Sequence, residues 1–539
     1  MKKNTFSKIN IVNFLSSPIF ILILILPLSA FYHLWNPSGY PYGPSHDESI
    51  YMRRTMNVLE GQGPQESLLY DHPYFAQIFL AGILGIVGYP NSLHLSANYD
   101  IHSIEMLWLV PRVLMGLLAV IDTFLVYKIA EYRYNKTIAI IASILFVVTP
   151  TTWMLRRVWL ESIQLPFLLC SILFAIYSKR ISSLEEKEEK KDKQQNKNKL
   201  HILLVFLSGI FLGLAIFTKV PIFTMIPLVG FLIYTNNKSL KALGLWFIPV
   251  ILIPLIWPIY AICINEFNFW LDGIYFQTHR GMQSIFEAIE YNFKTNSITI
   301  VLGIIGILFA AIKKDIFPLL WTVPFLVFLY FAGAVSFWHL IPLFPIFCIG
   351  SSIVIEKLWK KINVKNVKKI KHILLFSIIL GGFFVGMLYL TVKMITSDNS
   401  IHFKAVAFVS QYLQNNTDYK NKIILISNPF YSWIPKYVFH LNNYQIIDYY
   451  DNIPIKAERV LFIADSQWEK TMSANFSHNM KENFKLYSKN EIANFDDLEY
   501  NISIYEEYNL PIHNKTKSEK TLELINNLVK YNNITSPNK

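Results

Sequence analysis

Residues 19–32 read IFILILILPLSAFY, a stretch without a single charge. Runs of this kind recur along the 539-residue chain, for example at Ile202–Phe217, Ile298–Ala311 and Ile373–Leu390. Segments approaching about 20 apolar residues match the hydrocarbon core of a bilayer. The composition agrees, because 53% hydrophobic and 16% charged residues are unusual for a soluble protein. The sequence therefore predicts an α-helical integral membrane protein.

The distribution of charge predicts how the chain crosses the membrane. A net charge of +12 could indicate a nucleic-acid partner, but residues 396–539 are nearly neutral. The positive excess lies instead in alternate connections between apolar runs, as in the cytoplasmic loops of membrane proteins. We therefore expect a multi-pass protein of the cell membrane in contact with lipids, with a cytoplasmic N-terminus and no nucleic-acid partner. The basic connections are Lys2–Lys8, Lys128–Lys136, Lys179–Lys199, Lys238–Lys241, Lys313–Lys314 and Lys357–Lys371.

The apolar runs divide the chain into a membrane domain and a C-terminal domain. About eleven runs within residues 1–395 are expected to span the bilayer, the first near Phe14–Trp35. Because eleven is odd, residues 396–510 should be extracytoplasmic, followed by a polar tail at 511–539. Five N-x-S/T sequons agree with that side. They begin at Asn415, Asn475, Asn501, Asn514 and Asn533.

Two connections in the membrane domain have distinctive compositions. The first outer loop covers residues 36–103 and includes a short apolar segment, Tyr74–Tyr89, which we expect to lie in the outer interface. Residues 179–199 are rich in Lys, Glu and Gln without an apolar period. Such a stretch is typical of a solvated loop, here on the cytoplasmic side.

The extracytoplasmic domain is predicted to be α/β. Phe403–Leu413 has the apolar spacing of a helix, whereas Lys422–Ser427 and Arg459–Ala464 are short apolar runs typical of buried strands. Three further elements are predicted, namely helices over Trp433–Leu441 and Gln467–Phe484 and a strand over Tyr500–Tyr508.

The first outer loop holds residues that could carry chemistry. Asp47 and Glu48 follow a Pro- and Gly-rich break and open a predicted short helix, and His72 follows in an Asp-His-Pro sequence. A carboxylate in such a place can remove a proton from an attacking group. However, Ser45-x-x-Glu48 also fits a helix capping box, and this explains the acids equally well when they are considered alone.

Ionisable residues also occur at the predicted outer ends of later spans. Basic groups that converge at the mouth of a helical bundle could hold a phosphate at the membrane surface. Each one singly is better explained by snorkelling towards the interface. An anion site therefore depends on the helices bringing them together. The residues are Arg112, Arg156, Arg157, Glu161, Lys219 and His339.

These motifs, taken in order, resemble those of the GT-C fold glycosyltransferases that use polyprenyl-phosphate sugars. The resemblance covers roughly residues 14 to 360 and is greatest to the protein O-mannosyltransferase and aminoarabinose transferase branch. The chain departs from that pattern at Tyr74, where a second proline is usual. The matching pieces are Asp47-Glu48-x-x-Tyr51, Gly61-x-Gly63-Pro64, Asp71-His72-Pro73, Pro111-Arg112, Thr149-Pro150 with Arg156 and Glu161, Gly209-x-x-x-Gly213 before Lys219, and Trp338-His339.

The resemblance implies an inverting transfer of a sugar from a polyprenyl- or dolichyl-phosphate to a protein, lipid or glycan acceptor outside the cytoplasm. It implies that Asp47 is the catalytic base and that Glu48 completes a catalytic acid pair. Fixed cations would stabilise the departing phosphate. The residues implied to bind or orient the substrates are Tyr51, His72, Arg112, Arg156, Glu161, Lys219 and His339.

Other features bear on cofactors, origin and alternative functions. Some relatives hold a divalent metal with an Asp-x-Asp in this loop, but the sequence here has none, so we expect no metal or other cofactor. The Lys-, Asn- and Ile-rich composition and the sequons suggest a prokaryotic, archaeal cell surface. A transporter or lipid flippase is the main alternative, although it should carry mid-span charges, of which Asp122 is the main example. A non-catalytic receptor or assembly subunit is a further alternative.

Overall fold

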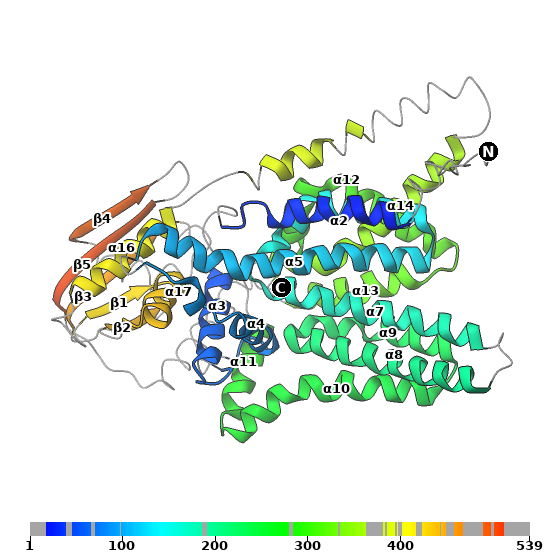
Figure 1. Cartoon of the computed structure of the whole chain (residues 1–539), viewed down its shortest axis with the longest axis horizontal. Coiled ribbons are helices and arrows are strands. Elements are labelled where there is room, and N and C mark those ends of the chain that lie inside the picture. Colours follow the sequence, from blue (N-terminus) through cyan, green and yellow to red (C-terminus); the bar gives the residue numbers. More distant parts are fainter. Residues whose placement is uncertain are drawn as a thin grey trace, which may run out of the picture.

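The structure of the protein is a computed structural model. It describes residues 18–38, 46–65, 70–96, 99–185, 191–279, 284–332, 335–362, 381–382, 385–393, 396, 401–416, 423–441, 444–448, 457–466, 489–496 and 501–510. A bundle of long helices forms one end of the molecule and a β-sheet domain forms the other (Figure 1).

Long apolar helices build the bundle. Within the described residues, seven helical segments are long and apolar enough to cross a membrane, or eight if the bent pair α6 and η2 is one span. α2 and α13 are apolar but shorter. The predicted class, a multi-span helical membrane protein, is confirmed; the predicted span at Ile373–Leu390 lies largely outside the described residues. The long helices are α2 (Pro18–Leu34), α5 (Ile101–Arg133), α6 (Lys136–Val148), α7 (Leu160–Glu185), α8 (Lys191–Thr218), α9 (Ile226–Asn237), α10 (Leu240–Cys263), α12 (Ile285–Ile312), α13 (Phe317–Phe331) and α14 (Phe344–Ile362).

Three short 3-10 segments interrupt the bundle at the end that faces the sheet domain. Each contains a proline, whose missing N–H prevents a regular α-helix from continuing. At the first break the chain bends by 71°. Buried amides stabilise this bend, since Thr151 donates its backbone N–H to Asn296 Oδ1 at 3.2 Å. The segments are η2 (Pro150–Arg156), η3 (Val220–Met225) and η4 (Phe337–Leu343).

Three short helices lie at the same end of the bundle (Figure 1). α3 (His46–Leu59) and α4 (Phe75–Ile86) belong to residues 36–103, the predicted first outer loop, and α11 (Phe267–His279) follows α10. α4 coincides with the apolar segment predicted at Tyr74–Tyr89 and packs against α3. Its length of 12 residues is too short for a perpendicular span, as the sequence predicted.

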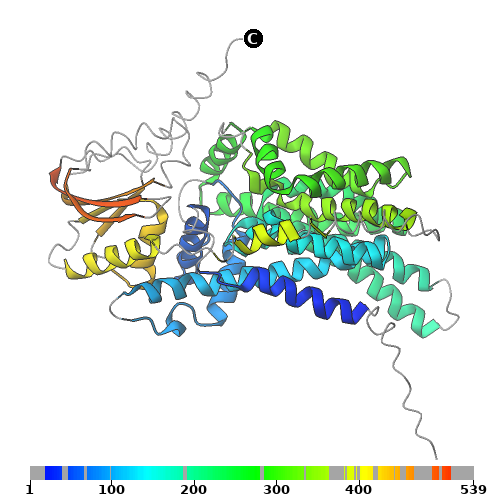
Figure 2. The ribbon, with the colours of Figure 1, turned by 90° about the horizontal axis from the view of Figure 1, so that it is seen from above.

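The C-terminal domain is a five-stranded sheet with helices, as predicted. The strand order is β2-β1-β3-β5-β4, in which β1 pairs in parallel with both β2 and β3, and β5 is antiparallel to β3 and β4. α16 packs against β4 and β5, and Figure 2 shows this domain at one end of the bundle, where α16 also contacts α5. The elements are α16 (Ile401–Asn415), β1 (Ile423–Ser427), α17 (Pro429–Trp433), η7 (Ile434–Val438), β2 (Tyr444–Asp448), β3 (Ala457–Asp465), β4 (Glu491–Asp496) and β5 (Asn501–Leu510).

Two local predictions change. Residues 179–199 were expected to form a loop, but α7 continues to Glu185 and α8 begins at Lys191. Lys, Glu and Gln are good helix formers, so a polar stretch can extend helices out of a membrane without an apolar period. β2 and β4 were not predicted, and the predicted helix over Gln467–Phe484 lies outside the described residues.

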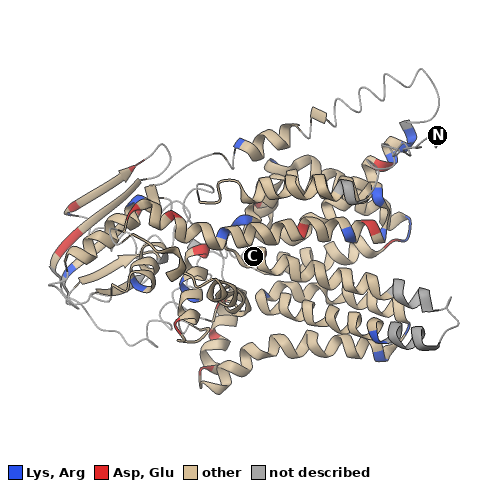
Figure 3. Ribbon diagram, in the orientation of Figure 1, with Lys and Arg blue, Asp and Glu red and all other residues tan. Residues whose placement is uncertain are grey.

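The distribution of charge and a shared hydrophobic cluster distinguish the two ends of the helical bundle. Lys and Arg gather at the end of the bundle that lies away from the sheet domain (Figure 3). At the other end, one continuous hydrophobic cluster joins buried residues of α3, α4 and α5 to those of α16, α17 and the sheet. The sheet domain is therefore packed against the same end of the bundle that carries α3.

Candidate functional site

The α3 helix separates the two adjacent acids of the outer loop. Residues four apart in a helix share a face, so Asp47 lies above Tyr51, whereas Glu48 is turned about 100° away from Asp47. Glu48 is fully buried, while Asp47 is partly exposed. The acid pair predicted from the sequence therefore belongs to two different environments.

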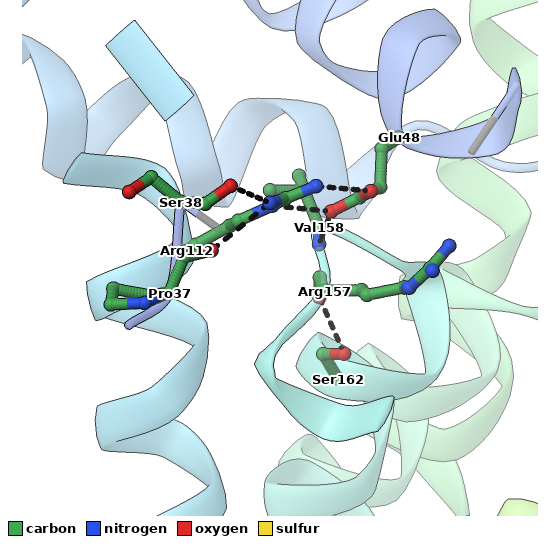
Figure 4. A network of polar contacts seen from close by, with 7 residues as sticks. All are labelled: Pro37, Ser38, Glu48, Arg112, Arg157, Val158 and Ser162. Carbon is green, nitrogen blue, oxygen red and sulfur yellow. Dashed lines mark hydrogen bonds and ion pairs between the residues drawn. The ribbon is translucent and has the colours of Figure 1, made fainter. Parts of the chain in front are cut away.

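Glu48 forms a closed network, which we call the Glu48 cluster (Figure 4). Arg112 of α5 donates from Nε to Glu48 Oε1 at 3.1 Å and from Nη2 to Glu48 Oε2 at 2.9 Å. The backbone N–H of Val158 donates to Oε1 at 3.0 Å. Arg112 Nη1 donates to the carbonyl oxygens of Pro37 and Ser38 at 3.0 and 3.3 Å. This cluster joins α3, α5, the end of the first span and the start of α7.

The electrostatics of Glu48 favour a permanently charged carboxylate. Burial alone would raise its pKa, but the attraction of Arg112 and Arg157 and the hydrogen bonds from Arg112 and Val158 outweigh burial and lower the pKa. A general base must exchange a proton near the working pH. Both Glu48 oxygens accept hydrogen bonds in this network, and the catalytic role of Glu48 stays a prediction.

Two predicted phosphate-binding cations are also part of the scaffold. Arg112 is fully buried, and all three of its nitrogens donate inside the Glu48 cluster. Arg156 is fully buried as well, and it donates to the carbonyl oxygens of Tyr32 at 3.4 Å and of Trp35. These carbonyls lie at the end of α2, where the last carbonyls of a helix have no intrahelical donor, so Arg156 contributes to capping that helix. Both arginines therefore hold the end of the α2 segment, and their roles in substrate binding stay predictions.

A second group of ionisable residues surrounds the Tyr51 phenol. Tyr51 is 8% exposed. Burial raises its pKa well above the ordinary value, and the negative charges of Asp47, Glu161 and Asp71 raise it further. The charges of three carboxylates from three segments therefore act on one phenol. We call Asp47, Tyr51, Asp71, Glu161 and Lys219 the Tyr51 cluster.

Ion pairs balance two of these carboxylates. Arg54 of α3 lies 2.9 Å from Asp71. Burial alone would raise the pKa of Asp71, but Arg54 and His72 outweigh it and lower the pKa. Lys219, at the start of η3, forms a buried ion pair with Glu161 at the start of α7. Asp47 is the carboxylate of this cluster that lies in α3 itself, in the first turn of the helix. 

The two predicted histidines lie at turns. The backbone N–H of His72 donates to Asp71 Oδ1 at 2.9 Å, so His72 follows directly after a member of the Tyr51 cluster. His339 accepts the Ser336 backbone N–H at Nδ1 at 3.0 Å and closes a capping box at the start of η4. Both side chains are partly exposed. The contacts of His339 tie it to η4, rather than to α3.

The geometry brings forward three residues to which the sequence assigned no individual role, and of these only Arg54 lay outside the predicted motifs. Asp71 and Arg54 act electrostatically on Tyr51, and Arg157 acts electrostatically on Glu48. The guanidinium of Arg157 lies 5.0 Å from the ring centre of Trp159 and is partly exposed, and Figure 4 shows it extending away from the Glu48 cluster. Their signals were present: Asp71 precedes the His-Pro pair, and Arg157 is adjacent to Arg156.

The metal-binding capacity of the site is limited. Within the described residues, no group of three or more His, Cys, Asp or Glu side chains could hold a metal ion. Near Tyr51 the carboxylates of Asp71 and Glu161 are paired with cations instead.

One protein-family model matches part of this chain. Residues 64–280 match the family model of dolichyl-phosphate-mannose-protein mannosyltransferases, a stretch that includes His72, Arg157, Glu161 and Lys219 but not α3. No curated protein matches the chain.

The fold is similar to solved membrane enzymes. ArnT from Cupriavidus metallidurans in its apo state superposes with a TM-score of 0.57 at 11% identity, covering 90% of this chain and 97% of that one. The Archaeoglobus fulgidus oligosaccharyltransferase tethered to an acceptor peptide gives 0.54 at 10% identity, covering 93% and 74%. The same organism's AglB in complex with an inhibitory peptide and a dolichol-phosphate gives 0.51 at 12% identity, covering 92% and 74%.

Proposed function

We propose that this chain, a membrane glycosyltransferase of the GT-C fold, transfers a sugar from a polyprenyl-phosphate donor to an acceptor on the extracytoplasmic side. The transfer inverts the configuration at the anomeric carbon. The family match favours a protein hydroxyl as the acceptor. The dolichol-phosphate bound to the structurally similar AglB favours an isoprenoid phosphate as the carrier. The observation that carries the proposal is the separation of Asp47 from Glu48 on α3.

Asp47 is the proposed general base. It is partly exposed, it lies in the first turn of α3, and the other acid of the pair is engaged with Arg112. In a single displacement the acceptor oxygen attacks the anomeric carbon and Asp47 takes its proton. The bond between that carbon and the phosphate oxygen breaks on the opposite side, and the lipid phosphate leaves with the electron pair. General-base assistance of this kind contributes about 10²- to 10⁴-fold to the rate.

The departing phosphate needs fixed positive charge. Arg157 is partly exposed between the Glu48 cluster and Trp159, and Lys219 stands at the start of η3 beside Glu161. Arg157 directly follows η2 and Lys219 directly precedes η3, so both cations lie at the ends of 3-10 segments. Preorganised charge in a site of low dielectric stabilises a developing anion more than mobile water does. We propose Arg157 as the main phosphate contact, with Lys219 beside it.

The reaction is proposed to proceed without a metal. The carboxylates near Tyr51 are already balanced by Arg54 and Lys219, so two fixed cations occupy the place that a divalent ion would take in an acid-rich site. Tyr51 and His72 are proposed to orient the sugar or the acceptor, because both are next to members of the Tyr51 cluster.

A matched pair of Asp→Asn variants tests the base. Asp47→Asn should reduce mannose transfer from radiolabelled dolichyl-phosphate mannose in isolated membranes by at least about 100-fold. Asp100→Asn, which changes the same residue type at a helix N-cap in the same loop, should stay within about twofold because Asn caps equally well. Mass spectrometry of the glycans of a deletion strain complemented with each variant detects sugar transfer from donors other than dolichyl-phosphate mannose. Retained glycosylation with Asp47→Asn in both assays would refute Asp47 as the base.

A further inference from the structure

The sheet domain contacts the helix that carries the proposed base. α17 and η7 follow β1 and pack against α3, which lies between them and the bundle (Figure 1). The buried residues on both sides belong to one hydrophobic cluster, so no solvent layer separates the domains there. A 14-residue helix such as α3 is marginal by itself, and its position is set by what packs around it.

An aromatic contact connects this face to the Glu48 cluster. Trp433 of α17 meets Trp108 of α5 edge-on, with ring centroids 5.4 Å apart, and both rings are fully buried. Phe430 approaches Trp108 at 5.8 Å. One helical turn further along α5, the guanidinium of Arg112 lies 5.4 Å from the same Trp108 ring. Arg112 in turn fixes Glu48 on α3.

A second contact reaches the other end of α3 directly. The hydroxyl of Tyr437, in η7, donates to Asn57 Oδ1 at 3.4 Å. Asn57 Nδ2 donates to the carbonyl oxygen of Gly63 at 3.0 Å, just beyond the end of α3. Tyr437 and Asn57 are both buried, at 2% and 4% exposure. The sheet domain thus supports α3 near its start through Arg112 and near its end through Asn57.

We propose that the α17–η7 face of the sheet domain positions the catalytic helix, with Trp433 and Tyr437 as positioning residues for sugar transfer. The proposal rests on the proposed function of Asp47. Transfer requires the acceptor oxygen, the anomeric carbon and the base to be aligned, and a displacement of about 1 Å can cost about 100-fold in rate. Trp433 acts through Trp108 and Arg112 and touches no substrate itself.

The test compares two aromatic-to-leucine variants of the same domain. Trp433→Leu removes the ring that contacts Trp108, whereas Phe462→Leu removes a fully buried ring of β3 that faces Tyr505 within the sheet. In mannose transfer from dolichyl-phosphate mannose, Trp433→Leu should lower kcat about 10-fold or more while KM for the donor stays within about twofold. Trp433→Phe should recover most of kcat, and Phe462→Leu should retain it.

Hydrogen exchange of the α3 amides gives a readout that does not depend on catalysis. Trp433→Leu should accelerate exchange over residues 50–59, and Phe462→Leu should leave it unchanged. Equal loss of kcat in both leucine variants, or wild-type kcat in Trp433→Leu, would overturn the proposal. If the wild-type protein transfers no sugar, the proposed function fails. The hydrogen-exchange data then still test the positioning role, because unchanged exchange of the α3 amides in Trp433→Leu would overturn it.

Discussion

The Glu48 cluster and the Tyr51 cluster lie on two faces of one short helix and contain the same kinds of side chain. In the Glu48 cluster a carboxylate and a guanidinium are fully buried and satisfy each other, a backbone N–H and two carbonyls. In the Tyr51 cluster the charges of three carboxylates act on one phenol, and Asp47 is partly exposed. The two clusters differ in exposure, because Glu48 and Arg112 are both fully buried whereas Asp47 is not.

This difference separates the residues that hold the structure together from those that could react with a substrate. A buried polar group whose hydrogen bonds are complete is stable in one protonation state and has nothing left to offer a ligand. An acid that is partly exposed can meet a substrate without first leaving the protein interior. In the proposed mechanism Arg112 and Arg156 therefore have a structural role, and Asp47 and Arg157 face the substrate.

The largest expected effect is on folding, from Glu48→Gln. This change leaves the Arg112 guanidinium buried without its carboxylate, which typically costs about 3–5 kcal/mol. We expect a large loss of thermal stability for the detergent-solubilised protein, measured by the unfolding midpoint. Because the pKa of Glu48 is lowered in the fold, its stabilisation is present above the ordinary carboxyl value of 4.5 and is lost as the pH falls through the lowered pKa.

The double variant Glu48→Gln with Arg112→Gln provides the control. Removing both charges leaves no unpaired ion, so the double variant should be more stable than Glu48→Gln alone. A Glu48→Gln protein with the wild-type unfolding midpoint and little activity would contradict the comparison, because it would place Glu48 in the chemistry and not in the scaffold.

The second prediction concerns the Tyr51 cluster and activity. Lys219→Met removes a cation proposed to stand beside the departing phosphate and also leaves Glu161 without its partner. By analogy with the removal of one preorganised donor from an anion site, turnover should fall about 10²-fold. Lys241→Met, at an exposed lysine near the opposite end of the bundle, should have no effect. Wild-type turnover in Lys219→Met would remove Lys219 from the site.

Much of the fold was predictable because its signals are local. Continuous apolar runs fix the spanning helices, and α16, β1, β3 and β5 follow from short periodic or apolar stretches. β2 and β4 were missed. β4 is an edge strand whose residues are mostly exposed or half-buried, so its sequence carries no apolar pattern. Helix formers such as Lys and Glu extended α7 and α8 where a loop was expected.

The site was predictable only in its residue types and their order. The motif residues were found, but which of two adjacent acids is buried depends on Arg112, 64 positions away in the chain. The contact of Trp433 with Trp108 joins segments more than 300 residues apart and has no local signal. Pairing across the chain is decided by tertiary packing, which a single sequence does not reveal.

The smallest effect is expected where the Tyr51 cluster meets α11. The Tyr70 hydroxyl donates to Glu266 Oε2 at 2.6 Å, and the backbone of Tyr70 packs so closely on α11 that a Cβ at Gly273 would lie 2.2 Å from its carbonyl oxygen. Tyr70→Phe removes only the hydrogen bond and leaves Glu266 accessible to water, so it should cost about 1 kcal/mol. Turnover should fall less than about fivefold, because Asp71 is still held by Arg54. Tyr234→Phe, at an exposed site on α9, is the control. A loss above tenfold would mean that the hydroxyl of Tyr70 takes part in the reaction, and the Tyr51 cluster would have to be extended to α11.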